Sequence, residues 1–439
     1  MSHTMPLAIS QKTEQKLSAD FKYMEGRMNG LRQSAIHDKK KQALQIFESL
    51  GIPTSRNEEW KYSPVWKFID EEACFATLPA EEHDFSDQMS TSQLGQASIT
   101  LVNGKLQQDS GIEGLTVMRL DKALENKDEV SQKFGSICLD EDEALTALNT
   151  AFFENGLYIR VGKKFDPSQE VDIIQVLEGN SNKFLHQRVL ITTEANTEVR
   201  LNYRFVCPNP NAVPFLNSVE EIFLADGARV HQLVDQELPD GFRMVNTRDA
   251  AQQKDSFYSH ISLAISGKFV RNNIRTKYLG QGCDCDISGL YLVDNDDLID
   301  HHLAADHTTP NCTSNQLFKG IMKGKGHGVF NGKVFVREQA QQTNAYQSNK
   351  NLLLSDKAII DTKPQLEIFA DDVKCSHGAT IGQLDNEPVF YLMARGIPED
   401  KARAMLTLAF ANDLLEKIKN QDLREHWQHI LESKLGLSA

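Results

Sequence analysis

The middle of the chain, from about residue 195 to 385, is a succession of short apolar runs with no long helical pattern between them. In the first run Val199, Leu201, Tyr203 and Phe205 alternate with polar or charged residues, which is typical of a strand with one buried face. Further strand-like runs, separated by Gly, Asn or Asp, follow at residues 220–224, 229–234, 256–265, 287–293, 317–322, 329–337, 351–354 and 366–369. Because no helices alternate with these strands, the pattern argues against a doubly wound sheet. It leaves a sandwich, a propeller or a β-helix.

Asparagine recurs among the short strands between residues 315 and 381, which favours one of these three folds. The recurring positions are Asn315, Asn331, Asn344, Asn349 and Asn351. Stacked coils of a β-helix place similar residues at repeated positions. No repeat is exact, so the spacing favours a β-helix without excluding the two alternatives.

The N-terminal 60 residues are predicted to be helical. Apolar residues recur there at spacings of three and four, and Gly51 and Pro53 end the pattern. The predicted apolar face consists of Leu17, Phe21, Met24, Met28 and Leu31, followed by Ala43, Phe47 and Leu50. An acidic, irregular stretch at residues 70–98 is interpreted as a linker.

The last 55 residues return to a helical pattern. A first helix ends at Arg395 and Gly396, and a second begins at Pro398. The second helix has a predicted apolar stripe of Ala402, Leu406, Ala409, Phe410, Leu414 and Ile418. A third opens on Asp422 and Glu425 as a capping pair and is expected to bury Leu423, Trp427, Ile430, Leu431 and Leu435. We therefore expect a helical region with linker at 1–95, a β body at 96–384 and a helical domain at 385–439.

Charge and cysteine content limit the partners and the compartment. With 47 Lys and Arg against 61 Asp and Glu, the chain carries a formal charge of −14, which argues against nucleic acid or an anionic membrane as the main partner. The one basic cluster, Lys39 to Lys41, is interpreted as a solvated helix face. No apolar run approaches the ~18 residues of a membrane span, and the start resembles no signal peptide. The seven irregularly spaced cysteines suit a reducing compartment, so we expect a cytoplasmic protein.

Cys375 and His377 form the sharpest local candidate for chemistry. If this segment is a strand, both side chains lie on one face, where a thiolate and an imidazole could bind one metal ion. Two ligands cannot complete a tetrahedral site, so a metal would need ligands from elsewhere in the chain or from another subunit. On spacing alone the simpler interpretation is favoured, in which Cys375 is a small buried residue and His377 a turn residue.

Three other groups are weaker candidates. Cys283 and Cys285 share a strand face with Ile287, and burial explains them best. The run His301, His302, His307 and Cys312 matches no zinc signature. The glycines Gly324, Gly326, Gly328 and Gly332 lie among strands and lack a phosphate-loop motif, so they are interpreted as turn glycines.

Several blocks of the chain resemble the SufB/SufD family of iron-sulfur cluster assembly proteins. The resemblance is dense over about 315–410, looser back to about 195, and extends to Arg56–Ser63. The blocks are Phe330–Val334, Ala340–Gln347, Asn351–Ser355, Lys363–Ile368, Asp371–Gly382 and Phe390–Ile397. The SufD branch fits better than the SufB branch because the closely spaced cysteines of SufB-type chains are missing.

This resemblance implies a mainly β fold, with a right-handed β-helix body flanked by N-terminal and C-terminal helical regions. It also implies a non-catalytic subunit of a cytosolic complex with a SufB homologue and the ATPase SufC, in which a partner hydrolyses ATP. The C-terminal helices, around Tyr391, Arg395, Gly396 and Pro398, would dock SufC, and the end of the β-helix would pair with SufB. Alone, the chain would form a homodimer, and whether a reduced flavin binds the complex is left open.

The resemblance also suggests where the missing metal ligands come from. His377 would supply an imidazole to a transient iron-sulfur cluster shared with SufB, Cys375 would be a secondary thiol, and Asp371 and Asp372 would tune the local charge. Two alternatives stay open: a SufB-like scaffold that itself holds an iron-sulfur cluster, and an exported β-helix enzyme acting on polysaccharide. A brown protein with labile iron and sulfide would favour the first, and lyase activity the second.

Overall fold

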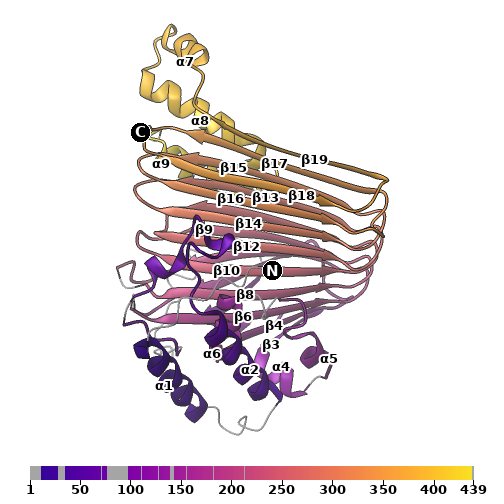
Figure 1. The fold of residues 1–439 in the computed structure, drawn as a ribbon. Coiled ribbons are helices and arrows are strands. Elements are labelled where there is room, and N and C mark those ends of the chain that lie inside the picture. The colour runs from indigo at the N-terminus through magenta and orange to yellow at the C-terminus, as the bar shows by residue number, and fades with distance from the viewer. Residues whose placement is uncertain are drawn as a thin grey trace.

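The computed structural model describes residues 11–27, 35–70, 72–76, 97–109, 111–126, 128–138, 143–154, 156–180, 182–211 and 213–437. The body of the protein is a β-solenoid of about 8 turns, and 44% of the chain is strand. Its coils stack into one column, with helices at both ends of the chain (Figure 1). The expectation of a mainly β, β-helical fold is therefore confirmed.

Two sheets form the walls of the solenoid. In spatial order, the ten-stranded sheet contains β19 (Val373–Gly382), β17 (Thr343–Leu353), β15 (Thr313–Met322), β13 (Asp284–Val293), β11 (Phe257–Ile265), β9 (Arg229–Glu237), β7 (Glu198–Val206), β5 (Glu170–Val176), β1 (Ala97–Val102) and β2 (Lys105–Asp109). The nine-stranded sheet contains β18 (Ile359–Ile368), β16 (His327–Val336), β14 (Leu298–His307), β12 (Phe269–Tyr278), β10 (Arg243–Gln252), β8 (Phe215–Leu224), β6 (Phe184–Thr193), β4 (Gly156–Val161) and β3 (Leu115–Arg119).

From β4 onward the chain alternates between the two walls, and strands within a wall are parallel and in register. The predicted alternation in β7 is confirmed, because Val199, Leu201 and Tyr203 are fully buried in the interior of the solenoid. Several turns between strands use residues with positive φ, including Asn196, Asp255 and Asn295. Asn and Asp adopt this backbone conformation more easily than most residues, which explains why they separate the strands in the sequence.

The helices of the N-terminal part of the chain pack along the solenoid, from its first coils to β16. They are α1 (Gln11–Arg27), α2 (Ala35–Leu50), η1 (Glu58–Trp60), η2 (Val65–Phe68), α4 (Leu120–Asn126), α5 (Asp128–Lys133) and α6 (Ala144–Phe152). Leu17, Phe21, Met24 and Phe47 are buried against α6 and the sheet, as the spacing predicted. Met28, Leu31 and most of the predicted linker, at 77–96, lie outside the described residues.

The prediction of a solvated face for Lys39 to Lys41 was wrong at its middle residue, since Lys39 and Lys41 are exposed but Lys40 is not. Lys40 does not lie on a solvated face, because its ammonium group is buried and donates to the carbonyl oxygens of Ala151 and Phe153 at the end of α6. The same group lies 3.8 Å from the centre of the Phe153 ring. Burial lowers the pKa of Lys40 to about 7. The lysine therefore caps a helix C-terminus and presents no charge to an outside partner.

The C-terminal helices are α7 (Asn386–Met393), α8 (Glu399–Leu415) and α9 (Gln421–Lys434). Leu414, Ile418, Leu423 and Trp427 pack on the outer face of the ten-stranded sheet, as predicted. Phe410 and Leu435 are partly buried against the same cluster, and Ala402 is buried, so the predicted stripe was wrong at one position only among those it named. That position is Ala409, which is exposed.

The cap of α9 also differs from the prediction. The side-chain oxygen of Asn420 accepts a hydrogen bond from the backbone N–H of Leu423, so Asn420 is the N-cap in place of Asp422. No helix among the described residues is long and apolar enough to span a membrane.

Candidate functional site

The last coil of the solenoid is open on one side. β18 pairs only with β16, and β19 only with β17, so each strand has one edge without a neighbour among the described residues. Figure 1 shows both strands at the upper end of the column. Large apolar side chains are exposed on and beside them: Tyr346, Ile359, Ile368, Phe369 and Ile381. Unpaired strand edges next to exposed apolar residues are typical of a surface that another chain covers.

Cys375 and His377 both lie on β19, two positions apart and on the same face, as the sequence predicted. Their neighbours in register on β17 are Ala345 and Gln347, which are buried. Cys375 is half-buried and packs against the core of the solenoid, while His377 is exposed. Both side chains therefore stand on the inner face of the wall at its open edge.

A polar column continues from His377 into the solenoid. Nε2 of Gln347 donates to Oε1 of Gln316 over 2.6 Å. The Gln347 side chain fills the space beside Gly332, where a Cβ atom would lie 2.3 Å from Nε2 of Gln347. Gly332 is thus a packing glycine inside β16, which also contains Gly328, so the prediction of turn glycines was wrong for these two positions.

The Cys375 thiol is not activated by its surroundings. Burial raises the pKa of Cys375 above its ordinary value, and the hydrogen bond with the backbone of Ala345 opposes this only in part. A thiol in such a setting ionises when a metal ion or another cation approaches it. The turn before β19 is held by the backbone of Asp372, whose N–H donates to Oε1 of Gln341 and whose carbonyl accepts from Gln342.

The described residues contain no group of three or more His, Cys, Asp and Glu side chains placed to hold a metal ion. Cys283 and Cys285 are buried, as predicted. His301 and His307 are buried, while Nε2 of His302 lies 3.1 Å from Oδ1 of Asp300. The weaker candidates therefore do not form a metal centre in the described part of the chain.

An arm made of α7 and the start of α8 projects away from the column (Figure 1). Phe390 and Tyr391 are 71% and 57% exposed, and Met393 and Met405 are exposed as well. The guanidinium group of Arg395 lies 3.4 Å from the centre of the Tyr391 ring, and Gly396 has a φ of 86° at the end of α7. Pro398 is the N-cap of α8. Such exposed aromatic residues indicate a second surface that another protein covers.

The far half of α8 is fixed to the solenoid. Lys319 of β15 is buried, and its ammonium group donates to the carbonyl oxygen of Phe410 over 2.7 Å and to the carboxylate of Asp413. Leu414 and Trp427 add apolar contacts with the sheet. The arm is therefore attached to the β body through the α8 and α9 helices.

Residues 56–63 make a buried contact with the β body that the sequence did not reveal. Trp60 stacks on Arg271 of β12, with 3.7 Å between the guanidinium carbon and the ring centre. Nη1 of Arg271 donates to Oδ2 of Asp300 over 3.0 Å and to Ser63 over 2.9 Å. All four side chains are buried. We call residues 56–63 the strap, because they bind the outer face of the nine-stranded sheet at a buried ion pair.

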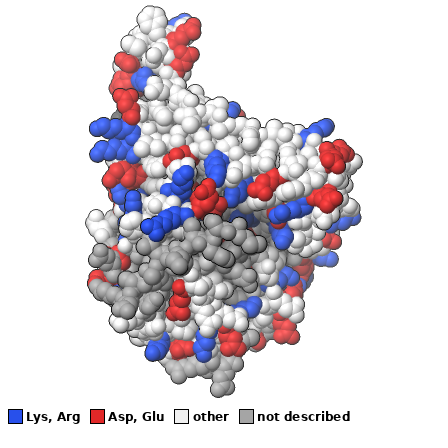
Figure 2. All heavy atoms as spheres, in the orientation of Figure 1, with Lys and Arg blue, Asp and Glu red and all other residues white. Residues whose placement is uncertain are grey.

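The acidic residues of the strap reach the open end. Glu59 pairs with Lys333 of β16 and with His302, and hydrogen bonds from these two side chains lower its pKa to about 2. Oε1 of Glu58 accepts from Lys363 of β18 over 2.6 Å. Over the face drawn in Figure 2, acidic and basic side chains are interspersed and do not form separate fields. The partners of the strap lie more than 200 residues away in the chain, so no local signal could identify them.

Comparison with known proteins shows what this chain is similar to. Residues 176–410 match the family described as SUF system FeS cluster assembly, SufBD core domain, and residues 11–173 match the SufBD protein N-terminal region. The chain is 30% identical to iron-sulfur cluster assembly protein SufD of Escherichia coli, covering 88% of this chain and 89% of that protein. It is 25% identical to SufD of Bacillus subtilis, covering 96% and 99%. A SufBD family protein of Synechocystis is 28% identical, covering 94% of each chain.

Proposed function

Because the chain belongs to the SufBD family of iron-sulfur cluster assembly proteins, we propose that it is the SufD-type subunit of a cytoplasmic assembly complex. In this complex it pairs with a SufB homologue and with the ATPase SufC. It is a non-catalytic subunit, and SufC hydrolyses the ATP. We propose a separate role for each predicted region. Residues 1–95 contain the strap, residues 96–384 form the β body, and residues 385–439 form the helices that dock the ATPase.

The open end of the solenoid is the observation that carries this proposal. β18 and β19 each offer one row of unpaired backbone groups, and exposed apolar residues flank them. A second β-solenoid could continue both sheets across this end by adding its own edge strands. A SufB homologue would have the same type of strands to offer. When the chain is alone, a second copy would occupy the same surface and give a homodimer.

His377 and Cys375 lie at that proposed junction. We assign His377 the role of an imidazole ligand for iron of the nascent cluster, with the remaining ligands from the SufB chain. Cys375 is a secondary thiol, which ionises only when iron approaches because burial raises its pKa. Asp371 and Asp372, in the turn before β19, would add negative charge near the incoming cation. The cluster is the cargo of the site.

The projecting arm is the proposed docking surface for SufC. Its exposed aromatic residues, including Tyr391, lie beside Arg395, Gly396 and Pro398. Because α8 and α9 are anchored on the ten-stranded sheet, a movement of the arm would be transmitted to the solenoid. ATP-driven closure of two SufC subunits would in this way shift the junction with SufB and expose the cluster site.

The test is co-expression of this chain with the SufB and SufC proteins of the same organism, followed by native mass spectrometry and measurement of iron and sulfide. His377→Ala is compared with wild type, and His429→Ala serves as a matched control because His429 is an exposed histidine of α9. We expect an intact complex for all three chains. Iron and sulfide should fall only for His377→Ala.

Two results would contradict the proposal. Unchanged cluster formation by His377→Ala would remove the ligand role and leave a structural subunit. Failure to form any complex, together with a brown isolated chain that carries labile iron and sulfide, would favour the SufB-like scaffold. Replacement of Cys375 by Ser should have a smaller effect than His377→Ala if the thiol is secondary.

A further inference from the structure

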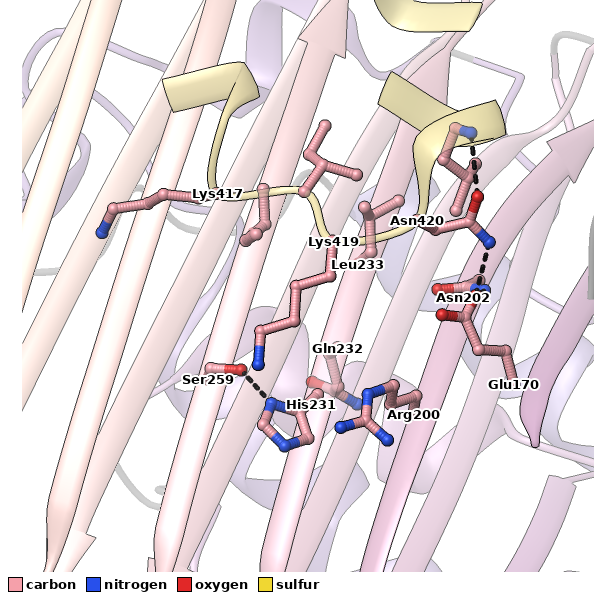
Figure 3. Close-up of a pocket in the computed structure, with 13 residues that line it drawn as sticks. Glu170, Arg200, Asn202, His231, Gln232, Leu233, Ser259, Lys417, Lys419 and Asn420 are labelled. Carbon is pink, nitrogen blue, oxygen red and sulfur yellow. Dashed lines mark hydrogen bonds between the residues drawn. The ribbon is translucent and has the colours of Figure 1, made fainter. Parts of the chain in front are cut away.

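A cavity of about 90 Å³ lies between the outer face of the ten-stranded sheet and the linker that joins α8 to α9. This space can hold several water molecules or one small polyatomic ion. Its floor contains Arg200 of β7, His231 of β9 and Ser259 of β11, and its roof contains Lys417 and Lys419 of the linker (Figure 3). The cavity is distant in the fold from β18 and β19, since these floor strands lie in the middle of the sheet.

The floor residues form one row across three strands. Arg200 is the register neighbour of His231, and His231 is the register neighbour of Ser259. Nδ1 of His231 lies 2.8 Å from Oγ of Ser259, and Nε2 lies 3.2 Å from Oε1 of Glu198. The histidine therefore connects a hydroxyl group on one side to a carboxylate on the other.

Most charged groups at the cavity are paired. Arg200 pairs with Glu198, Lys417 donates to Asp286 and Ser288, and Glu170 accepts from Asn202 and Asn420. Lys419 is different, because it has no hydrogen bond or ion pair with any described residue. Figure 3 shows its side chain reaching down from the linker toward Ser259 and His231. Within the described structure, a cation that is not paired thus stands over a row that already contains an arginine.

We propose that this cavity binds a small oxyanion, in which Lys419 and Arg200 provide the charge and Ser259 a hydroxyl group. The chemical class is a phosphate group, either inorganic phosphate or the terminal group of a phosphomonoester, since cations and a hydroxyl recognise the same oxygens in both. The open side of the cavity would accommodate the remainder of an ester. A bound anion would connect the α8–α9 linker to the sheet. It would thereby stiffen the joint that carries the projecting arm.

The electrostatics of His231 support the proposal. The pKa of His231 is lowered to about 4, chiefly by burial; the positive charges of Arg200 and Lys419 contribute to the decrease, and Glu198 opposes it. The remaining charged groups that face the cavity are Glu170 of β5, Lys417 of the linker and Asp286 of β13. Arg200 and Lys419 thus disfavour a proton on His231 when no ligand is present, and an anion bound between these cations would reduce that effect.

Anion binding should be linked to a proton. In the neutral ring, a proton on Nε2, which faces Oε1 of Glu198 at 3.2 Å, leaves Nδ1 to accept the hydrogen bond of the Ser259 hydroxyl. A nearby anion stabilises the imidazolium ion, whose Nδ1–H then donates to Ser259 Oγ. The Ser259 hydroxyl is thereby free to donate to the anion. Affinity should consequently increase as the pH falls.

The experiment measures anion binding to the full chain by thermal shift and equilibrium dialysis at constant ionic strength, with chloride as the reference salt. Inorganic phosphate and glycerol phosphate distinguish the two sources, and sulfate is used for the pH series because its charge does not change between about pH 5 and 8. The variants are Lys419→Gln and His231→Gln. Lys357→Gln is the control, because Lys357 is exposed in the turn between β17 and β18.

We expect saturable phosphate binding that weakens about tenfold in Lys419→Gln and is unchanged in Lys357→Gln. Sulfate should bind more tightly at low pH in wild type, and this pH dependence should be lost in His231→Gln. Tighter binding of glycerol phosphate would identify an ester as the ligand. Equal responses to chloride and phosphate, or unchanged affinity in Lys419→Gln, would overturn the proposal. Neither outcome bears on complex formation or on His377, so the proposed function is tested separately.

Discussion

The two ends of the solenoid consist of the same stacked coils but differ in how the last strands are covered. At the first end β2 and β3 run antiparallel to β1 and β4, and α4 to α6 pack beside them. Phe134, Phe153 and Tyr158 are buried between these helices and the outer face of the nine-stranded sheet near this end. At the last end β18 and β19 continue the parallel register and then stop, with Ile381 53% exposed.

This difference shows what each end requires. A solenoid coil is stabilised by its neighbours, so a terminal coil needs a cap or a partner. Although β2 and β3 each have one edge without a neighbour among the described residues, the first end has a partial cap of antiparallel strands and adjacent helices within the chain. The last end has none among the described residues, and it is also where His377 and Cys375 lie. An end that needs a second protein is therefore the end that carries the candidate cluster ligands.

The largest expected effect is on stability at the closed end. Phe153→Ala should destabilise the isolated chain by about 3–5 kcal/mol, because it empties a buried ring position beside Phe134 and Lys40. Ile381→Ala at the open end should change stability by less than about 0.5 kcal/mol. Denaturant unfolding measures both, at a protein concentration low enough to dissociate the homodimer. Equal losses of stability would show that the open end is capped in the monomer and that the comparison is wrong.

The next effect is on association at the open end. Ile381→Asp should weaken pairing with the SufB homologue, and the homodimer of the isolated chain, by about 100-fold, because a carboxylate would be buried without a partner at the junction. Sedimentation and native mass spectrometry measure the assembly. Leu279→Asp is the control, since Leu279 is exposed in the turn between β12 and β13. Assembly that resists Ile381→Asp but fails in Leu279→Asp would move the interface to the side of the solenoid.

The local pattern predicted much of this architecture. Alternation identified β7, and the period of two correctly placed Cys375 and His377 on one face of their strand. The open edge could not be predicted in the same way. β19 has a residue pattern like those of strands inside the sheet, and only the order of the strands in space makes it an edge. β18 contains Pro364, a residue that favours edge strands, but a single proline does not identify the end of the solenoid.

The strands that the sequence missed have a common physical cause. β10, β12 and β14 bury charged and polar residues, so they lack a clear alternation of apolar and polar positions. Arg275 of β12 pairs with Asp249 of β10, and Arg271 pairs with Asp300 of β14. Each ion pair joins positions far apart in the chain, and a burial that depends on a distant partner leaves no local signal.

A smaller effect should appear in the pH dependence of stability in the middle of the column. Burial lowers the pKa of His301 to about 4, from an ordinary value of 6.5 in the unfolded chain. The unfolded chain therefore binds a proton first, and stability is lost as the pH falls below 6.5. His301→Phe retains the ring between Tyr291 and Phe318 but removes the titration. Between about pH 8 and pH 5 the variant should lose roughly 2 kcal/mol less stability than wild type.

Parallel unfolding curves against pH for wild type and His301→Phe would contradict this assignment. His429→Ala is the control, because His429 is exposed and its removal should leave the slope as in wild type. The pH dependence tests whether the interior between the two ends excludes enough water to keep the His301 imidazole neutral.

The smallest effect concerns the contact between the strap and the open end. Oε1 of Glu58 accepts from Lys363 of β18 over 2.6 Å, and this hydrogen bond lowers the pKa of Glu58. Because Glu58 is exposed and Lys363 is only partly buried, Glu58→Gln should leave the unfolding midpoint within error of wild type.

Arg271→Met, in contrast, leaves the buried Asp300 without its guanidinium partner and should lower the free energy of unfolding by about 3–5 kcal/mol. The strap would then be held by its buried ion pair, with β18 free to accept a partner strand. Hydrogen exchange of β18 that rises sharply in Glu58→Gln would show instead that the strap holds the open end in place.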